Sequence, residues 1–337
     1  MQRLDHFMAQ ANAAYYAAHD PYTDYTTSPE ITQVFGEILG LWAAAVWDAM
    51  GRPNSILFTE AGPGRGTLMA DALRAIAQVM PGFRAAVQVH FAAVQVHFIE
   101  TSPRLRQLQA GQVPHATWHD AIQQLPPGPM ILLANEFLDA LPIRQFVRRA
   151  DGWSERYVAG GTFLEQHADP PAGPHAALRH AAEGQIAEVC EPAIAISFDL
   201  GARLARQGGA ALFIDYGPER GAPGDTLQAL RGKRPANPLA EPGTADLTAH
   251  VDFQAVAEAA RSAGAAVYGP IPQGVFLTRL GLFQRTDQLA RTQPLRRAAA
   301  LIAAAQRLAE PQLMGKLFKA LAICHPACAT PPGFDPA

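Results

Sequence analysis

The glycine-rich segment at residues 60–66, Glu-Ala-Gly-Pro-Gly-Arg-Gly, constrains the fold of this 337-residue chain more than any other feature. It follows a short apolar run at 55–59 and leads into a helical pattern over 67–79. Glycines at such a turn let the backbone approach a ligand closely, and the helix that follows points its N-terminus at that ligand. The segment therefore predicts a strand, a ligand-binding loop and a helix, which together open an α/β fold.

The spacing of the glycines narrows the class of ligand. A dinucleotide fingerprint needs a third glycine three residues after the second, and Thr67 occupies that position. The alternating glycines Gly62, Gly64 and Gly66 after Glu60 are instead typical of S-adenosylmethionine binding. We expect Glu60 to accept a hydrogen bond from the ammonium group of the ligand and the glycines to leave room for its methionine portion. A tight turn with a purely structural role is the alternative.

Acidic residues end the next two predicted strands. Glu100 ends an apolar run, and the sequence after it, Thr-Ser-Pro at 101–103, is typical of a helix start. A carboxylate at the end of the second strand is placed to bind the two ribose hydroxyls of a nucleoside. Asp120 stands at the expected end of a third strand, where its side chain and the next backbone amide would face an adenine. A solvated loop aspartate is the alternative, since most aspartates are exposed.

A continuous apolar run at 130–134 is typical of a parallel strand buried on both faces. In doubly wound sheets ligands bind at the carboxyl ends of the strands, so we expect Asn135 to contact the cofactor. Glu136 and Asp139 are predicted to hold a cationic group such as a guanidinium, or to orient a nucleophile. The alternative for Asp139 is that it caps a short helix or forms a salt bridge with it.

Two further candidates for catalysis follow later in the chain. Another apolar run, at 210–214, ends at Asp215, which predicts one more carboxylate at the edge of the pocket. His250 lies close to Asp246 and Asp252 in the sequence, an arrangement that suits a proton relay. A histidine held within a loop network explains His250 equally well.

Composition and charge exclude several classes of protein. The net charge of −3 and the pI of about 6.4 do not suit a nucleic-acid-binding surface. No apolar run reaches the length of a membrane span and no signal peptide is visible, so we expect a cytoplasmic protein. The three cysteines cannot form a disulfide framework or a zinc module, and we expect no bound metal. The oligomeric state stays open.

The chain is predicted to be organised around one α/β domain with a doubly wound, mostly parallel sheet. Capping residues at 27–30 and apolar residues at three- and four-residue steps predict one long amphipathic helix, which Gly51 and Pro53 end. The expected parts are a helical extension at 1–54, the main domain at 55–325 with insertions at about 143–190 and 217–250, and a flexible tail at 326–337.

Within the insertions, the pattern predicts a hairpin of 143–149 with 153–159, a loop at 160–175 and an irregular loop at 217–244. Helices are expected near 253–263 and 294–309, and a last strand near 315–323. The sequence AAVQVHF occurs at 85–91 and again at 92–98. Because seven is odd, the two copies would point their apolar residues to opposite faces of one strand. We expect the second copy to form the strand that leads to Glu100.

Taken together, these motifs resemble the MidA family of S-adenosylmethionine-dependent methyltransferases, which includes a mitochondrial assembly factor of respiratory complex I that acts on an arginine. The resemblance is carried by Tyr15-Tyr16 and by residues 24–30, 60–66, 100–103, 134–142, 214–217, 246–253 and 314–323.

The resemblance implies a class I methyltransferase fold and cofactor contacts at Gly62, Gly64, Gly66 and Glu100. It also implies a protein arginine as the methyl acceptor, a bacterial cytoplasmic location for this chain and the mitochondrial matrix for its eukaryotic relatives. The chain departs from the family pattern at a shortened segment, 21–23, and at the repeat before Glu100. Both departures touch the cofactor side of the fold, and the first would weaken a lid formed by 26–30.

Methyl transfer needs alignment and exclusion of water rather than a metal or a nucleophilic residue, and the visible motifs suit that need. Two other functions fit the same residues: methylation of a small molecule, and an assembly protein that binds the cofactor without turnover. Two features disfavour an NAD-dependent oxidoreductase. The glycine spacing differs from the dinucleotide fingerprint, and Glu100 lies further from the glycines than the roughly 20 residues expected.

Overall fold

The computed structural model describes residues 1–19, 24–83 and 96–334. Contacts within the chain divide it into two compact units. The first unit comprises Met1–Thr26, Phe137–Phe198 and Tyr216–Ala259, and the second comprises Thr27–Glu136, Asp199–Asp215 and Ala260–Ala337. Two of the predicted catalytic residues, Glu136 and Asp215, are therefore each the last residue of the second unit before the chain enters the first.

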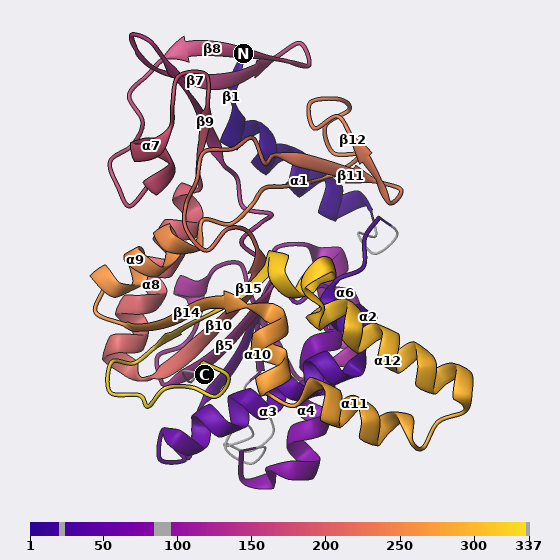
Figure 1. The fold of residues 1–337 in the computed structure, drawn as a ribbon. Helices are drawn as coiled ribbons and strands as arrows, with labels where there is room; N and C mark the ends of the chain where they lie inside the picture. The colour runs from indigo at the N-terminus through magenta and orange to yellow at the C-terminus, as the bar shows by residue number, and fades with distance from the viewer. Residues whose placement is uncertain (20–23, 84–95, 335–337) are drawn as a thin grey trace. The chain divides into compact units, whose positions relative to one another are not determined.

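A seven-stranded sheet forms the centre of the second unit (Figure 1), with the strand order β4-β3-β2-β5-β10-β15-β14. The five strands from β4 to β10 pair in parallel, whereas β14 and β15 are antiparallel to one another. The expected α/β fold with a mostly parallel sheet is confirmed. The strands are β2 Leu57–Ala61, β3 Val96–Ile99, β4 Thr117–His119, β5 Met130–Asn135, β10 Gly209–Tyr216, β14 Ala266–Pro272 and β15 Phe318–Cys324.

The strand order reverses direction at β2. The chain moves outward from β2 through β3 to β4, and then returns to β5 on the other side of β2. Ala61 of β2 lies opposite Ile99 of β3 and Ala134 of β5, so all three strands end at the same edge. Such a switch point is where doubly wound sheets bind their ligands.

The helices confirm several sequence predictions. The glycine loop leads into α4 (Thr67–Val79) as predicted, and Ser102 caps α6 (Pro103–Gln112) by accepting a hydrogen bond from the Leu105 amide. The expected helices near 253–263 and 294–309 are α9 (Phe253–Ser262) and α12 (Leu295–Ala309). The sequence did not predict α8 Glu191–Gln207, α10 Gln273–Arg279 or α11 Leu282–Ala290.

The single long helix expected after residue 27 is wrong. The structure has a short α2 (Ser28–Ile31) followed by α3 (Gln33–Ala49), and Thr32 between them is extended, with φ of −159°. The Thr32 hydroxyl accepts a hydrogen bond from the Val34 amide at 3.3 Å and so caps α3. A threonine hydroxyl can compete with the helical hydrogen bonds in this way, which the apolar pattern does not reveal.

The first unit contains a five-stranded antiparallel sheet, in which β1-β7-β6-β9 are neighbours and β8 pairs with β7, and a three-stranded sheet in the order β12-β11-β13. The predicted hairpin is confirmed as β6 and β7. The elements are β1 Gln2–Arg3, α1 Leu4–Ala18, β6 Arg144–Arg149, β7 Gly152–Ala159, β8 Thr162–His167, α7 Ala176–His180, β9 Ile186–Val189, β11 Gln228–Arg231, β12 Arg234–Ala236 and β13 Asp246–Thr248.

Two segments expected to be loops contain hairpins instead. Residues 160–175 were predicted as a loop, but Gly160 and Gly161, with φ of +57° and +75°, turn β7 back into β8. Gly232 and Lys233, with φ of +58° and +63°, join β11 to β12 within the stretch predicted to be irregular. Two-residue turns with both φ values positive match the twist of paired strands, and a Gly-Gly pair is a recognised signal for them.

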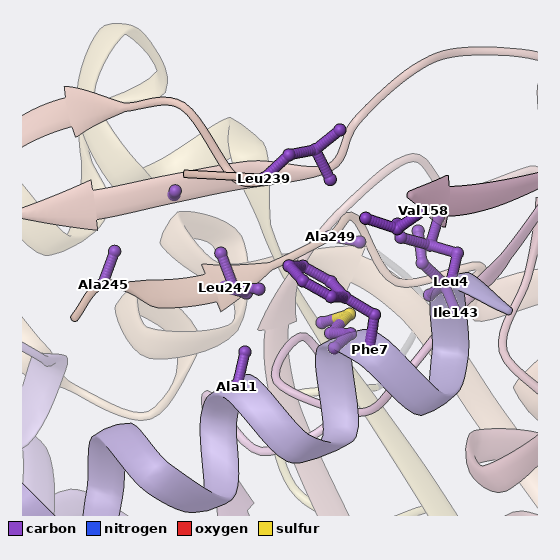
Figure 2. Packing of buried hydrophobic residues seen from close by; sticks show 11 residues of the cluster. Leu4, Phe7, Ala11, Ile143, Val158, Leu239, Ala245, Leu247 and Ala249 are labelled. Atoms are coloured by element: carbon purple, nitrogen blue, oxygen red, sulfur yellow. The ribbon is translucent and has the colours of Figure 1, made fainter. Parts of the chain in front are cut away.

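Helix α1 closes the core of the first unit (Figure 2). Its residues Leu4, Phe7 and Ala11 face Leu247 and Ala249, at and just beyond β13. Phe7 is 7% exposed and Leu4 is fully buried, which makes α1 an integral part of this core.

Replacing Phe7 with alanine is expected to lower the free energy of unfolding by about 3 kcal/mol, because a buried aromatic side chain loses its contacts and leaves a cavity. Urea denaturation followed by circular dichroism measures this change. Gln10→Ala on the exposed face of the same helix is the matched control and should cost less than about 0.5 kcal/mol. A Phe7→Ala variant as stable as this control would show that α1 does not hold the core.

Two predictions concern the repeat and the C-terminus. Residues 96–98 of the second repeat copy lie in β3, while the first copy and the start of the second lie outside the described residues.

The tail expected to be loose from residue 326 is packed as far as Phe334, whose ring contacts Phe276 at 5.0 Å between centroids. The Trp42 indole also donates a hydrogen bond to the carbonyl of Pro332.

Candidate active site

The glycine loop adopts a backbone that its three glycines make possible. Gly62, Gly64 and Gly66 have φ values of +64°, +54° and +84°, in the left-handed region that other residues disfavour. The Gly62 amide donates to the carbonyl of Ile99 at 3.1 Å, and the Gly66 amide donates to that of Pro63 at 2.7 Å. These bonds fold the loop against the end of β3 and begin α4 directly at the sheet edge.

Glu60, at the penultimate position of β2, is 3% exposed. Burial raises the pKa of its carboxyl well above its usual range, although the Met69 amide donates a hydrogen bond to it. Its Oε2 atom has no hydrogen-bond partner among residues 1–19, 24–83 and 96–334. Buried carboxylate oxygens are normally paired, so this atom fits a donor on a bound ligand, such as an ammonium group.

Glu100 lies directly after β3 and is 9% exposed. Its Oε1 atom accepts from the Ser102 amide at 2.8 Å, and its Oε2 atom accepts from Nε2 of Gln109 at 3.2 Å. Burial raises the pKa of this carboxyl, and these hydrogen bonds act in the opposite direction. The carboxylate is held in one orientation and keeps free lone pairs for further donors, as the binding of two ribose hydroxyls requires.

Asp120 is less suited to a ligand than its position suggested. Its carboxylate forms an ion pair with Arg106 at 2.6 Å and its side chain is 65% exposed. Its backbone amide donates to Oε1 of Gln124 at 2.8 Å. An adenine contact at Asp120 stays a prediction and would compete with these bonds.

Asn135 is the last residue of β5, and Glu136 follows it at the same edge of the sheet. The Asn135 amide nitrogen donates to Oε1 of Glu136 at 3.0 Å, and the backbone amide of Ser28 donates to the same atom at 3.1 Å. Glu136 has φ of +51°. A left-handed backbone at a residue other than glycine costs roughly 1–3 kcal/mol and occurs often at functional sites. The strained backbone and the two hydrogen bonds fix where the Glu136 carboxylate lies.

Helix α2 connects Glu136 to the glycine loop. Besides the contact of Ser28, Oε1 of Glu30 accepts from the Thr67 hydroxyl at 2.6 Å, and its Oε2 lies 4.0 Å from Nη1 of Arg65. Residues of α2 therefore bind the start of α4, the loop and the end of β5 within the second unit. Thr67 and Ser28 were not predicted as site residues, because their roles depend on contacts between distant segments.

In the first unit, Asp139 belongs to a group of buried carboxylates and tyrosines. Asp139 is 6% exposed and accepts a hydrogen bond from Tyr216, while burial raises its pKa. Asp246 accepts from the Tyr16 hydroxyl at 2.6 Å, and burial together with the charges of Asp139 and Asp24 raises its pKa to about 7. No helix follows residue 136 before β6 begins, so the helix-capping alternative for Asp139 is not supported.

The sequence did not single out Asp246, Asp24 or Tyr16 as site residues. The Asp24 carboxylate also accepts from the Tyr15 hydroxyl at 2.6 Å and from the Gly232 amide at 2.7 Å. Tyr15-Tyr16 and Asp24 belong to the motifs quoted for the family resemblance, which is the one signal that would have found them.

Asp215 and His250 occupy separate units. Asp215 is 1% exposed on β10 of the second unit. In the first unit the His250 amide donates to the Thr226 hydroxyl at 2.8 Å, and its ring packs edge to face on Tyr216. His250 also lines a cavity of about 20 Å³, which has room for about one water molecule. The catalytic roles of both residues stay predictions.

The residues that the structure describes contain neither a candidate metal site nor a helix that could span a membrane. Within 1–19, 24–83 and 96–334, no group of three His, Cys, Asp or Glu side chains is arranged to hold a metal ion. In the same residues, no helix is long and apolar enough to cross a bilayer.

The parallel sheet with its glycine loop and strand-end carboxylates has close counterparts among known proteins. The family model described as "Putative S-adenosyl-L-methionine-dependent methyltransferase" matches residues 38–271. "Protein arginine methyltransferase NDUFAF7, mitochondrial" of Danio rerio is 33% identical and covers 90% of this chain and 77% of its own length. The Homo sapiens protein of that name is also 33% identical, with coverages of 89% and 73%.

A solved structure of similar fold is also described as a methyltransferase. A likely methyltransferase of the COG1565 superfamily from Burkholderia thailandensis, bound to S-adenosylhomocysteine, superposes with a TM-score of 0.75. It is 28% identical and covers 99% of this chain and 89% of its own.

These findings define an α/β methyltransferase that uses S-adenosylmethionine as its cofactor. The chain belongs to the S-adenosylmethionine-dependent methyltransferase family that this model describes, which confirms the resemblance to the MidA family. Among the described residues, the buried, unpartnered Oε2 atom of Glu60 and the hydrogen-bonded carboxylate of Glu100 fit this cofactor.

Proposed function

We propose that the protein is a protein-arginine N-methyltransferase that acts on a homologue of a respiratory complex I subunit. Two observations support this proposal in a chain whose relatives are named protein arginine methyltransferases: the half-buried carboxylate of Glu136 in the second unit and, separately, the buried carboxylates of Asp139 and Asp246 in the first. The cytoplasmic location and the protein substrate belong to the same proposal.

The cofactor supplies a methyl group already activated by its sulfonium. In our proposal, the cofactor is held by Glu60, Gly62, Gly64, Gly66, Glu100 and Asn135, and the sequence pattern adds Asp120 as a further candidate. Glu136 is the first candidate to bind the guanidinium through charge-assisted hydrogen bonds and to localise its charge, which leaves one terminal nitrogen free to attack, and Asp139 stays a candidate for the same role. Asp215 stays a candidate for contact with the acceptor, and His250 stays a candidate for taking up the proton that this nitrogen loses.

The electrostatics of the first unit favour a cationic acceptor. Burial and the nearby charges of Asp139 and Asp24 disfavour the ionised form of Asp246 and raise its pKa. Among the interactions that set this pKa, only the hydrogen bond from Tyr16 lowers it. An opposite charge within a few ångströms would lower the pKa of these carboxyls and stabilise their ionised forms. A guanidinium supplies that charge, whereas a neutral small molecule does not.

This acidic group predicts a pH dependence of stability. The Asp246 carboxyl titrates near 3.8 in a model peptide, and burial raises its pKa to about 7 in the folded protein. The folded state therefore holds this proton more tightly, and its contribution to stability is lost as pH rises from about 4 to about 7. The free energy of unfolding of Asp246→Asn minus that of the wild type is therefore expected to increase by about 2 kcal/mol from pH 5 to pH 8.

Urea denaturation of both proteins at the two pH values measures this gain. Asp151→Asn, at an exposed position of the same unit, is the matched control and should show no such change. A constant difference between Asp246→Asn and the wild type across this range would contradict the raised pKa of Asp246.

The function itself is tested by methyl transfer from radiolabelled S-adenosylmethionine into a respiratory-chain extract, followed by hydrolysis of the labelled protein. Label in methylarginine supports the proposal. Label only in small molecules would replace it with the small-molecule alternative. Binding of S-adenosylhomocysteine without any transfer would favour the assembly protein without turnover.

A further inference from the structure

Gln109 of α6 is a polar residue with no exposed surface in the second unit. Its Nε2 atom donates to the carbonyl oxygen of Gly64 at 2.8 Å and to Oε2 of Glu100 at 3.2 Å. One side chain thus bonds both to the glycine loop and to the carboxylate at the end of β3. Neither the resemblance nor the strand-end pattern pointed to it.

The orientation of this amide is fixed by Trp118. The Trp118 indole Nε1 atom lies 2.7 Å from Oε1 of Gln109, and an indole nitrogen can only donate. The carbonyl end of the amide must therefore face Trp118, which turns its two N–H bonds toward Gly64 and Glu100.

Helix α6 also holds the neighbouring backbone on both sides of this amide. Arg106, one turn earlier, donates from Nε to the carbonyl oxygen of Glu100 at 2.8 Å. A Cβ atom on Gly66 would lie 3.5 Å from the Cα of Gln109, so the loop packs directly on the helix. The loop and Glu100 are therefore fixed relative to one another through α6.

We propose that Gln109 is a positioning residue that sets the distance between the glycine loop and the Glu100 carboxylate. This distance determines whether the loop can contact the methionine portion of S-adenosylmethionine while Glu100 binds the ribose. The inference rests on the proposed assignment of Glu100 and the loop as cofactor contacts. Gln109 itself does not touch the cofactor in this account. It satisfies the Gly64 carbonyl and holds one oxygen of Glu100, which leaves the remaining lone pairs for the ribose.

The first test replaces Gln109 with methionine, which has a similar length and no amide. The two acceptors, Gly64 and Glu100, then lose their donor, and we expect the affinity for S-adenosylhomocysteine to fall by about tenfold in calorimetric titration. Gln107→Met on the exposed face of α6 is the matched control and should bind as the wild type does. Thermal unfolding confirms that each variant is folded. If Gln109→Met does not fold, Trp118→Phe removes the donor that orients the amide, keeps an aromatic ring at this position and is expected to weaken binding two- to threefold.

A second variant gives a signature that a purely structural role would not produce. Gln109→Glu places a second carboxyl beside Glu100, and two carboxyls in one site share a proton with a raised pKa. The affinity of this variant for S-adenosylhomocysteine is expected to rise several-fold as pH falls from 8 to 6, because the protonated carboxyl again donates to Glu100. Gln109→Met should follow the pH dependence of the wild type.

Comparison with Glu100→Ala separates the possible failures. If Glu100→Ala binds weakly while Gln109→Met and Trp118→Phe bind as the wild type does, the role of Gln109 is overturned and the cofactor assignment stands. If Glu100→Ala also binds normally, the assignment of Glu100 is wrong and the inference falls with it. A Gln109→Glu variant without pH dependence would likewise overturn the coupling.

Discussion

Glu136→Gln is expected to reduce methyl transfer by about 100-fold or more while the affinity for S-adenosylhomocysteine stays within a few-fold. Glutamine has the same shape and can still accept the hydrogen bonds that the Ser28 amide and Asn135 donate to Glu136. It lacks the negative charge that would bind and orient a guanidinium, and misalignment of about 1 Å at a reacting centre costs this much. The initial rate of label transfer from S-adenosylmethionine and a parallel calorimetric titration measure the two quantities.

Glu183→Gln is the matched control, because Glu183 is exposed. It should leave both rate and affinity unchanged. Turnover of Glu136→Gln at the wild-type rate would remove Glu136 from the catalytic machinery. An equal loss of transfer and of S-adenosylhomocysteine binding would instead place Glu136 on the cofactor side, with Asn135.

The elements predicted correctly are those whose signals are local. The apolar run before Glu60, the glycines after it and the helical pattern from Thr67 lie within 25 residues, and the structure reproduces all three. The cap at Ser102 is another such signal. Period and capping are properties of neighbouring residues, so no knowledge of the tertiary structure is needed to recognise them.

The errors in the fold have two physical causes. Thr32 breaks the expected helix because its hydroxyl caps the helix that follows, although the apolar stripe continues across it. The hairpins at Gly160-Gly161 and Gly232-Lys233 lie in segments whose glycines also suit a loop, but two adjacent residues with positive φ reverse the strand in each. The first of these hairpins was predictable from the sequence, since its Gly-Gly pair carries the signal.

The same difference between local and long-range signals applies to the residues of the candidate site. The sequence predicts Glu60, Glu100 and Glu136 as site residues because each stands at the end of an apolar run, where a parallel sheet places its ligand-binding residues. Tyr16 and Asp246 are 230 residues apart in the sequence, and their hydrogen bond exists only through tertiary contacts of the first unit. Residues that act on other residues over such distances carry no local pattern.

Glu100→Ala is expected to weaken the binding of S-adenosylhomocysteine by about 100-fold. Two hydrogen bonds from ribose hydroxyls to an ionised carboxylate are lost, each contributing about 1.5 kcal/mol or more. The loss should be nearly the same for adenosine, which retains the ribose, because the affected bonds involve that part of the ligand. Calorimetric titration with both compounds measures it, and thermal unfolding shows that the variant is folded.

Asp120→Ala is the informative comparison, because the sequence placed both acidic residues on the cofactor. The Asp120 carboxylate is already paired with Arg106 and its side chain is 65% exposed, so its removal should change affinity less than threefold. Equal losses in the two variants would return Asp120 to the adenine site and show that its ion pair with Arg106 opens on binding. Normal binding by Glu100→Ala would mean that the ribose is held elsewhere on the sheet edge, and that burial of this carboxylate serves only to fix the start of α6.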